Sequence, residues 1–285
     1  MKPDPDRLLE HLKQVSRERN FETTPKTLSE IESYVKKEFL SFGYEVQEDS
    51  FLFLGQTFSN LIARLHPDLK RPRLIVGAHF DSVSHSPGAD DNATGVASLL
   101  EAARIFAALA PSQENAFVEF AAFNLEEYGM VGSRSYAQKL KRAGVPILGM
   151  LSLEMIGYTS REPGSQKMPL FLKPFYSDIG NFVGLVANLK SKKFLREVEA
   201  IFRGVEELPI QTLTLPGKGG IFPETRLSDH SSFWDEGFAA ILVTDTSLFR
   251  NPYYHTSQDR IETLDLSFLA KVTEATVRTI LRFTS

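Results

Sequence analysis

The stretch RLIVGAHFDSVSHSPGADDNATG (residues 73–95) predicts how the middle of this chain folds. It opens with a near-continuous apolar run, which is typical of a strand covered on both faces of a sheet. It leads into the alanine-rich segment 93–110, whose apolar side chains recur on one stripe and predict a helix. Two histidines and three aspartates lie between the apolar run and this helix, so ionisable groups collect where a buried strand ends.

The same alternation continues along the chain. Three further apolar runs predict buried strands, at 116–124, 147–157 and 239–245. Segment 133–145 predicts a helix that ends at Gly144, and segment 266–283 predicts a C-terminal amphipathic helix. Strands that alternate with helices predict an α/β fold, a three-layer sandwich with a central mixed, mostly parallel sheet flanked by helices.

The remaining segments have weaker patterns. Apolar residues at helical spacing between Leu8 and Val15 and between Leu28 and Phe39 predict two opening helices. Segments 42–54 and 60–67 predict edge strands, the second of which turns at His66-Pro67. A helical pattern is expected from about Asn181 onward, and residues 215–233 form a loop rich in glycine and proline. Because there is no internal repeat or linker, we expect residues 1–285 to form a single domain.

Composition excludes several classes of protein. With 42% hydrophobic residues, 24% charged residues and a net charge of −4, the chain is typical of a globular protein, and we expect no nucleic-acid partner. Apolar runs are too short for a secretory signal or a bilayer span, so we expect no membrane association and a cytoplasmic location. Cysteine is absent, so any metal would be held by histidine, aspartate and glutamate.

Ionisable side chains follow or end each predicted core strand. They are His79 and Asp81 after the first strand, Glu126 and Glu127 after the second, Glu154 in the third, His255 after the fourth, and Asp90 and Asp91 where the alanine-rich helix starts. The carboxyl ends of parallel strands meet at one edge of a sheet, which is where α/β proteins bind ligands. We therefore expect these side chains to converge.

Each residue taken alone also has a structural explanation. Asp91 or Asn92 is suited to cap a helix, the two glutamates suit a solvated loop, and His255 suits a surface turn. Glu154 is harder to explain in this way, because a lone buried carboxylate is costly unless it is paired or binds a cation. Together the carboxylates would repel one another unless cations neutralise them.

The set of donors suggests a site for two metal ions. Nitrogen and oxygen ligands without sulfur suit Zn²⁺, with Mn²⁺ or Co²⁺ as possible substitutes. Two ions need one bridging carboxylate, an imidazole and a carboxylate each, and a further carboxylate as base. The aspartate pair 90–91 supplies the bridge, His79 and Glu154 serve one ion, and His255 and one glutamate of the pair 126–127 serve the other. Asp81 is expected to orient His79.

Five motifs in this order resemble the M28 family of zinc aminopeptidases over most of the chain. They are H-x-D (79–81), PGADDNATG (87–95), NLEEYG (124–129), LEMIG (153–157) and YHTSQD (254–259). The resemblance implies a single M28-type catalytic domain with two zinc ions. It implies that Asp91 is the bridging ligand, Glu126 the base and Glu127 a ligand. Many members carry aspartate where this chain has Glu154, so we expect the ion at Glu154 to bind more weakly.

The resulting hypothesis is hydrolysis of the N-terminal residue from peptides that have a free amine. Alternatives are a glutaminyl-cyclase-like acyltransferase with one zinc, a carboxypeptidase or dipeptidase, and a binding module without activity. Asp229, His230 and Tyr254 are candidate substrate contacts, although Ser228 could equally cap a short helix that begins near His230. The sequence predicts no role for His85 or Asp90, and it predicts neither the oligomeric state nor the preferred N-terminal residue.

Overall fold

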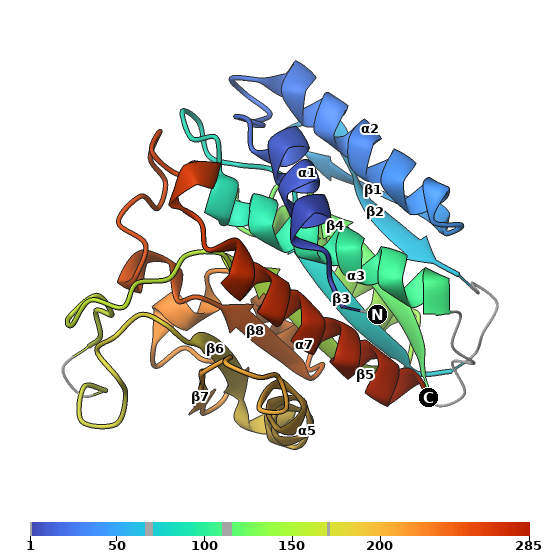
Figure 1. The fold of residues 1–285 in the computed structure, drawn as a ribbon. Helices are drawn as coiled ribbons and strands as arrows, with labels where there is room; N and C mark the ends of the chain where they lie inside the picture. Colours follow the sequence, from blue (N-terminus) through green and yellow to red (C-terminus); the bar gives the residue numbers. More distant parts are fainter. Residues whose placement is uncertain (1, 66–70, 110–115, 170–171) are drawn as a thin grey trace.

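An eight-stranded mixed sheet forms the centre of the protein (Figure 1). The computed structural model describes residues 2–65, 71–109, 116–169 and 172–285, so the turn expected at His66-Pro67 lies outside the described residues. The strands are β1 (Glu45–Phe53), β2 (Gln56–Arg64), β3 (Arg73–His79), β4 (Phe117–Phe123), β5 (Ile147–Glu154), β6 (Val183–Asn188), β7 (Ile210–Leu215) and β8 (Ala240–Thr244). Their order across the sheet is β1-β2-β4-β3-β5-β8-β6-β7.

Parallel pairing dominates the middle of the sheet. β3 pairs in parallel with β4 and with β5, and β5 pairs in parallel with β8. β6 and β7 are also parallel to each other, whereas β1 with β2, β2 with β4, and β6 with β8 are antiparallel. The four strands β3, β4, β5 and β8 therefore point the same way and end at one edge of the sheet.

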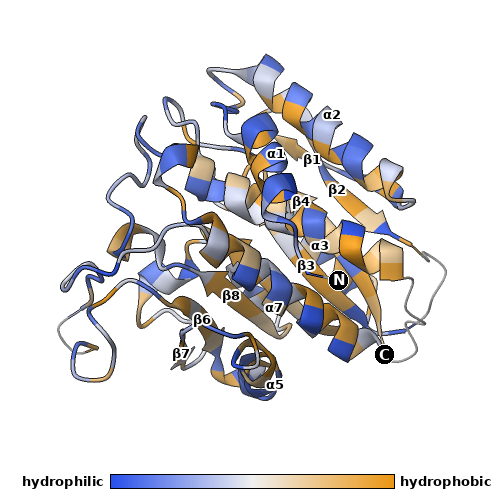
Figure 2. Cartoon of the chain, in the orientation of Figure 1, coloured by the Kyte–Doolittle hydropathy of each residue, from blue (hydrophilic) through white to orange (hydrophobic). Residues whose placement is uncertain are grey.

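Helices cover both faces of the sheet. The helices are α1 (Pro5–Val15), α2 (Pro25–Ser41), α3 (Gly95–Leu109), α4 (Val131–Arg142), α5 (Lys192–Phe202), α6 (His230–Asp235) and α7 (Leu266–Thr284). Apolar residues of α1, α2, α3, α5 and α7 join one buried cluster on one face, and those of α4 and α6 join a second cluster on the other. In Figure 2 the strands are largely hydrophobic, while the outward sides of α2 and α7 are hydrophilic. The predicted α/β sandwich is confirmed.

One prediction for the middle of the chain is wrong. The helical pattern expected from about Asn181 begins with a strand, β6, and helix α5 starts only at Lys192. All six residues of β6 are buried between β8 and β7, so the strand lacks the alternation that would have indicated it. Strand β7 was missed because its sequence, IQTLTL, is half polar, as suits an edge strand.

None of the described helices is long and apolar enough to cross a lipid bilayer.

The sequence predicts that segment 133–145 is a helix that stops at Gly144. Helix α4 ends at Arg142, and Ala143 and then Gly144, at φ 63°, follow it. Glycine adopts this left-handed conformation without steric cost, which is why the helix ends there.

Candidate metal centre

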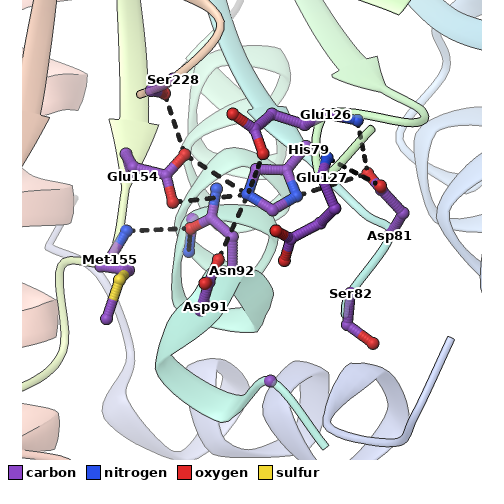
Figure 3. Close-up of polar contacts among 12 residues, drawn as sticks. His79, Asp81, Ser82, Asp91, Asn92, Glu126, Glu127, Glu154, Met155 and Ser228 are labelled. Carbon is purple, nitrogen blue, oxygen red and sulfur yellow. Dashed lines mark hydrogen bonds and ion pairs between the residues drawn. The ribbon is translucent and has the colours of Figure 1, made fainter. Parts of the chain in front are cut away.

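Asp91 belongs to both sets of candidate metal donors at the carboxyl ends of the parallel strands. Figure 3 shows the part of this cluster around His79. The Oδ1 atom of Asp91 is 3.4 Å from Nε2 of His79, the last residue of β3. Nε2 of His79 is also 3.3 Å from Oε1 of Glu154, the last residue of β5. Donor atoms of these three buried residues lie within 4.8 Å of one another, as metal ligands must.

A second set of three donors shares the same aspartate. Oδ2 of Asp91 is 3.1 Å from Nε2 of His255, and that nitrogen is 3.3 Å from Oε2 of Glu127. These atoms also lie within 4.8 Å of one another. The two oxygens of Asp91 thus face two different sets, each with one imidazole and one further carboxylate.

Glu126 belongs to neither set but lies beside the first. Its Oε2 atom is 3.9 Å from Nε2 of His79, and its carboxylate appears close to His79 and Glu154 in Figure 3. Glu126 and Glu127 follow β4 directly along the chain, yet they differ in position: only Glu127 completes a set of metal donors. Glu126 therefore lies beside the donors without belonging to either set.

Asp91 is free to face the imidazoles because Asn92 caps the helix in its place. Oδ1 of Asn92 accepts hydrogen bonds from the N–H groups of Gly95 and Met155, both at 3.1 Å. Its Nδ2 donates to the carbonyl of Leu153 at 2.8 Å. Asn92 therefore starts α3 and also holds the backbone on both sides of Glu154. The sequence left open whether Asp91 or Asn92 caps helix α3, and the structure shows that Asn92 does.

Asp81 has a wider role than the one predicted from its spacing to His79. Its Oδ1 atom lies 3.4 Å from Nδ1 of His79, which is compatible with orienting the ring. Its two oxygens also accept hydrogen bonds from the backbone N–H groups of Glu126 at 3.0 Å and Glu127 at 3.2 Å. Asp81 thus holds the segment that carries the candidate base and one candidate ligand.

Asp259 holds the other loop in the same manner. Its carboxylate oxygens accept from the N–H groups of Asp90 at 2.9 Å and Asp91 at 3.1 Å. Asp259 lies four residues after His255, so one short segment supplies a candidate ligand and also anchors the backbone of the bridging residue. The sequence motif contains Asp259, but only the fold shows which amides it binds.

Asp90, for which the sequence predicted no role, joins three segments below the cluster. It accepts from the N–H of Gly157 at 2.9 Å and from Nδ2 of Asn251 at 2.7 Å. Burial and the neighbouring carboxyl of Asp245 raise the pKa of Asp90 well above its ordinary value. Asp90 therefore has a structural role, because its carboxylate links its own loop to the segments around Gly157 and Asn251. His85, the other residue without a role, lies in an exposed part of the loop with φ 65° and belongs to neither set of donors.

The longer side chain of Glu154 has a partner that accommodates it. Its Oε2 atom accepts a hydrogen bond from Oγ of Ser228 at 2.9 Å. Ser228 lies in the loop before α6 and is fully buried. The sequence does not indicate this contact, because Ser228 equally suits a helix cap and lies 74 positions from Glu154.

The pKa values of the ionisable side chains in the cluster are shifted, because these side chains are buried close to one another. Burial raises the pKa of Glu127 and of Glu154 to about 7 each. Burial opposes the charged form of His255, but Asp91 and Glu127 outweigh it and raise the pKa of His255 to about 10. Burial would likewise raise the pKa of Asp91, yet its hydrogen bonds with His255 and His79 hold that pKa below its ordinary value. Asp91 thus stays ionised between the two imidazoles.

A cavity of ≈ 270 Å³ opens beside the cluster. Its wall includes Asp91, Glu126, Glu127, Glu154 and His255 at one end. Away from the cluster the lining is mainly apolar and includes Met130, Leu172, Tyr176, Phe182, Val186, Leu213, Phe222, Leu242 and Phe249. A mostly apolar cavity with a few polar groups at one end is typical of a binding site for a small molecule or a side chain.

The three predicted substrate contacts fall in different places. Tyr254 lines the cavity and stacks on the ring of His255, with the ring centroids 3.8 Å apart. Asp229 and His230 are fully buried and are not among the residues that line the cavity, and a contact with substrate stays a prediction for them. His230 forms a hydrogen bond with the carbonyl of Thr225 at 2.8 Å and packs edge-on against Trp234, which is a structural role.

An α/β sandwich that carries two adjoining sets of histidine, aspartate and glutamate donors at its strand ends is the arrangement of a metal-dependent hydrolase. The model of peptidase family M28 matches residues 60–280, and the chain belongs to this family.

Two relatives illustrate the range of the family. The uncharacterized protein YfbL of Escherichia coli is 33% identical over 264 residues, which cover 88% of this chain and 79% of YfbL. Aminopeptidase YwaD of Bacillus subtilis is 31% identical over 220 residues, which cover 74% of this chain but only 41% of YwaD. The chain thus spans less than half the length of that aminopeptidase.

Two solved structures show that the fold is shared more widely. The Legionella pneumophila LapA aminopeptidase has a TM-score of 0.79 at 21% identity, over 99% of this chain and 72% of its own. The glutaminyl cyclase of Porphyromonas gingivalis has a TM-score of 0.70 at 20% identity, over 98% of both chains. At these identities the similarity shows the fold alone.

Proposed function

We propose that this protein is an aminopeptidase that holds two zinc ions and removes the N-terminal residue of peptides, with Glu126 as general base. The observation that carries the proposal is the position of Asp91. One of its oxygens faces His79 and the other faces His255, and each imidazole has a second carboxylate beside it. A carboxylate shared in this way is what a pair of metal ions requires as a bridge.

The residues present fit zinc. The donors are imidazole nitrogen and carboxylate oxygen only, a set that zinc accepts and that Mn²⁺ or Co²⁺ could also use. Oε1 of Glu127 is buried without a hydrogen-bond partner among the described residues, which leaves an acceptor available for a cation. Zinc bound there would polarise the scissile carbonyl and lower the pKa of a water molecule.

Glu126 is proposed to move the proton. Burial, together with the nearby carboxylates of Glu154 and Glu127, raises the pKa of Glu126 well above its ordinary value, although His79 opposes the shift. A base whose pKa lies closer to the working pH can both accept a proton from the attacking water and return it to the leaving amine. Asp81 holds Glu126 in place through its backbone N–H.

The substrate is proposed to bind with its free amine toward the cluster and its side chain in the cavity. Carboxylates at the inner end of the cavity complement a positively charged N-terminus. Burying a charged side chain against the mainly apolar wall is costly, so large apolar N-terminal residues are expected to be preferred. Lys167 and Glu224 are the charged residues of the wall outside the cluster.

Zinc titration and a substrate panel test the proposal. The chelator-treated protein is titrated with zinc by calorimetry, with two ions per chain expected. Hydrolysis is then measured on leucyl, phenylalanyl, alanyl and lysyl 4-nitroanilides, with N-acetyl-leucyl 4-nitroanilide as the blocked control. Free-amine apolar substrates should be cleaved and the blocked one should not. Cleavage of the blocked substrate alone would instead indicate an endopeptidase.

The variant Glu126→Gln tests the base. Loss of general base catalysis typically lowers kcat by about 10² to 10⁴-fold. Zinc stoichiometry should stay at two, because Glu126 lies outside both donor sets. Glu206→Gln, at an exposed glutamate that belongs to neither donor set nor the cavity wall, is the matched control and should keep full activity. Near-wild-type turnover of Glu126→Gln with both ions bound rejects the assignment.

Glutaminyl cyclisation is the second candidate function, because the fold of the Porphyromonas gingivalis cyclase matches this chain over nearly its whole length. A single-zinc enzyme needs one donor set, whereas two complete sets are present here. Chromatography of a peptide with N-terminal glutamine separates the two functions. Pyroglutamyl product with one zinc per chain would favour the cyclase, and free glutamine with two zinc ions favours the aminopeptidase.

A further inference from the structure

Arg19 is a buried cation in the loop between α1 and α2, far in sequence from every candidate ligand. Its side chain is 0% exposed and is among the largest fully buried side chains of the protein. Arg19 lies outside the residues matched by the family model, which begin at residue 60. Neither the motifs nor the proposed mechanism gives this residue a function.

Among the described residues, all the hydrogen bonds of the Arg19 guanidinium go to backbone carbonyls. Nε donates to Phe80 at 2.7 Å, Nη1 to Pro87 at 2.7 Å, and Nη2 to Gly88 at 3.0 Å and Asp91 at 3.3 Å. Nη1 also donates to the carbonyl of Arg17 at 3.1 Å, which accounts for all five N–H donors of the group. Four of these five bonds reach the single loop that runs from His79 to Asp91.

The loop is wrapped around this group. A Cβ atom on Gly88 would lie 3.0 Å from both Nη atoms of Arg19, so glycine permits the close approach. The backbone of Arg19 adds two bonds to Ser82 in the same loop: its N–H donates to Oγ at 3.0 Å, and its carbonyl accepts from the N–H of Ser82 at 3.2 Å. Ser82 lies in this loop, between Asp81 and the start of α3, in Figure 3.

The neighbouring residue extends the contact to the second ligand-bearing segment. Nδ2 of Asn20 donates to the carbonyl of Ser82 at 2.9 Å. Oδ1 of Asn20 accepts from the hydroxyl of Tyr128 at 3.0 Å, and Tyr128 directly follows Glu127. The loop between α1 and α2 therefore contacts both chain segments that carry the candidate base and three of the five candidate ligands.

We propose that Arg19 is a positioning residue of the metal site, whose planar guanidinium fixes the loop between His79 and Asp91 so that the bridging carboxylate faces both imidazoles. A guanidinium suits this task because its five N–H donors lie in one rigid plane, whereas the three N–H donors of an ammonium lie on a single nitrogen atom. Burial opposes the charge and lowers the pKa of Arg19, while the carboxylates of Asp91, Asp81, Asp259 and Glu127 attract the charge.

The inference rests on the proposed metal site, and the experiment separates the two. Zinc affinity is measured by competition with a chromophoric chelator for the wild-type protein, Arg19→Lys, Arg19→Ala and the control Arg17→Ala. Arg17, two residues away, has a half-exposed side chain that pairs with Glu30 on the surface. If the wild type binds no zinc, the proposed function fails and this inference fails with it.

Loss of a residue that orients metal ligands typically weakens metal binding by about 10 to 100-fold. We expect this loss in Arg19→Lys, which keeps the charge but not the fork, with a circular dichroism spectrum like that of the wild type. Arg17→Ala should change affinity less than twofold. Methylguanidinium at non-denaturing concentration should restore zinc affinity and kcat to Arg19→Ala. It should not restore kcat to Glu126→Gln, and general stabilisation would not produce such a selective rescue.

Two results would overturn the proposal. One is wild-type zinc affinity and kcat in a folded Arg19→Lys or Arg19→Ala protein. The other is failure of Arg19→Lys to fold even with saturating zinc, because Arg19 would then be a core element on which the whole fold depends and not a residue specific to the site.

Discussion

Asn92 offers a test of how the helix start and the metal site depend on each other. Its fully buried side chain makes three hydrogen bonds, to the N–H groups of Gly95 and Met155 and to the carbonyl of Leu153. Asn92→Ala removes all three and changes no charge. At about 1 kcal/mol net for each bond, the free energy of unfolding of the metal-free protein should fall by about 3 kcal/mol.

Urea unfolding of the chelator-treated protein measures this loss. Trp234 is the lone tryptophan of the chain and is 1% exposed, so its fluorescence reports unfolding. With a urea slope of about 3 kcal/mol/M, the midpoint should fall by about 1 M. Zinc affinity should also fall by about 10 to 100-fold, because Asn92 holds the backbone on both sides of Glu154 and adjoins Asp91.

Asn188→Ala is the matched control for this prediction. Asn188 is also buried and also caps a helical turn, through bonds from the N–H and Oγ of Ser191, but it lies at the end of β6 and in neither donor set. It should lower stability by about 1 to 2 kcal/mol and leave zinc affinity unchanged. The reasoning is refuted if Asn92→Ala keeps its urea midpoint within about 0.2 M, or if its zinc affinity equals that of Asn188→Ala.

Three further predictions concern other parts of the molecule. Glu154→Asp withdraws the carboxylate from Oγ of Ser228, now at 2.9 Å, so calorimetry should show zinc bound about tenfold more weakly. This is the reverse of the expectation from the aspartate of many family members, and equal or tighter binding would support that expectation and contradict the fit of Glu154. Leu213→Trp adds bulk to the cavity wall, so the ratio of kcat/KM for phenylalanyl to alanyl 4-nitroanilide should fall at least about tenfold. An unchanged ratio would place the side chain of the substrate's N-terminal residue elsewhere. Burial lowers the pKa of His11 from 6.5 to about 4. Between these two pH values the unfolded chain therefore binds a proton at His11 that the folded chain does not bind. The free energy of unfolding should fall by up to about 3 kcal/mol as the pH drops from 6.5 to 4. Urea unfolding at pH 7 and pH 4.5 should show a smaller difference for His11→Phe than for the wild type, and equal differences would assign the slope to other groups.

Much of the fold was predictable because its signals are local. The apolar run that ends at His79 and the alanine-rich stripe of α3 report burial through periodicity, which survives in the sequence without the structure. β6 was not predictable, because a short apolar strand buried on all sides lacks alternation and resembles the helix that follows it. β7 failed for the opposite reason, since an edge strand can be half polar.

The candidate ligands could be predicted from the sequence because the ends of the buried strands can be predicted from it. Once parallel strands are expected, His79, Glu127 and Glu154 must meet at one edge, and the absence of cysteine restricts the donors to imidazole and carboxylate. Spacing cannot choose between adjacent residues such as Asp90 and Asp91, or Glu126 and Glu127. That choice needs the direction of each side chain, which the backbone conformation of the loop decides.

The sequence by itself thus determined the class of fold, the kind of donor atoms and the strand ends that carry them. Only the tertiary structure decided which oxygens face which imidazole, that Asn92 rather than Asp91 caps α3, that His230 is buried away from the cavity, and that Arg19 holds the loop of the bridging residue. The physical reason is that these contacts join residues that are often 60 to 170 positions apart through single hydrogen bonds to backbone groups. Such bonds depend on where the backbone passes, and they leave no periodic pattern in the side chains.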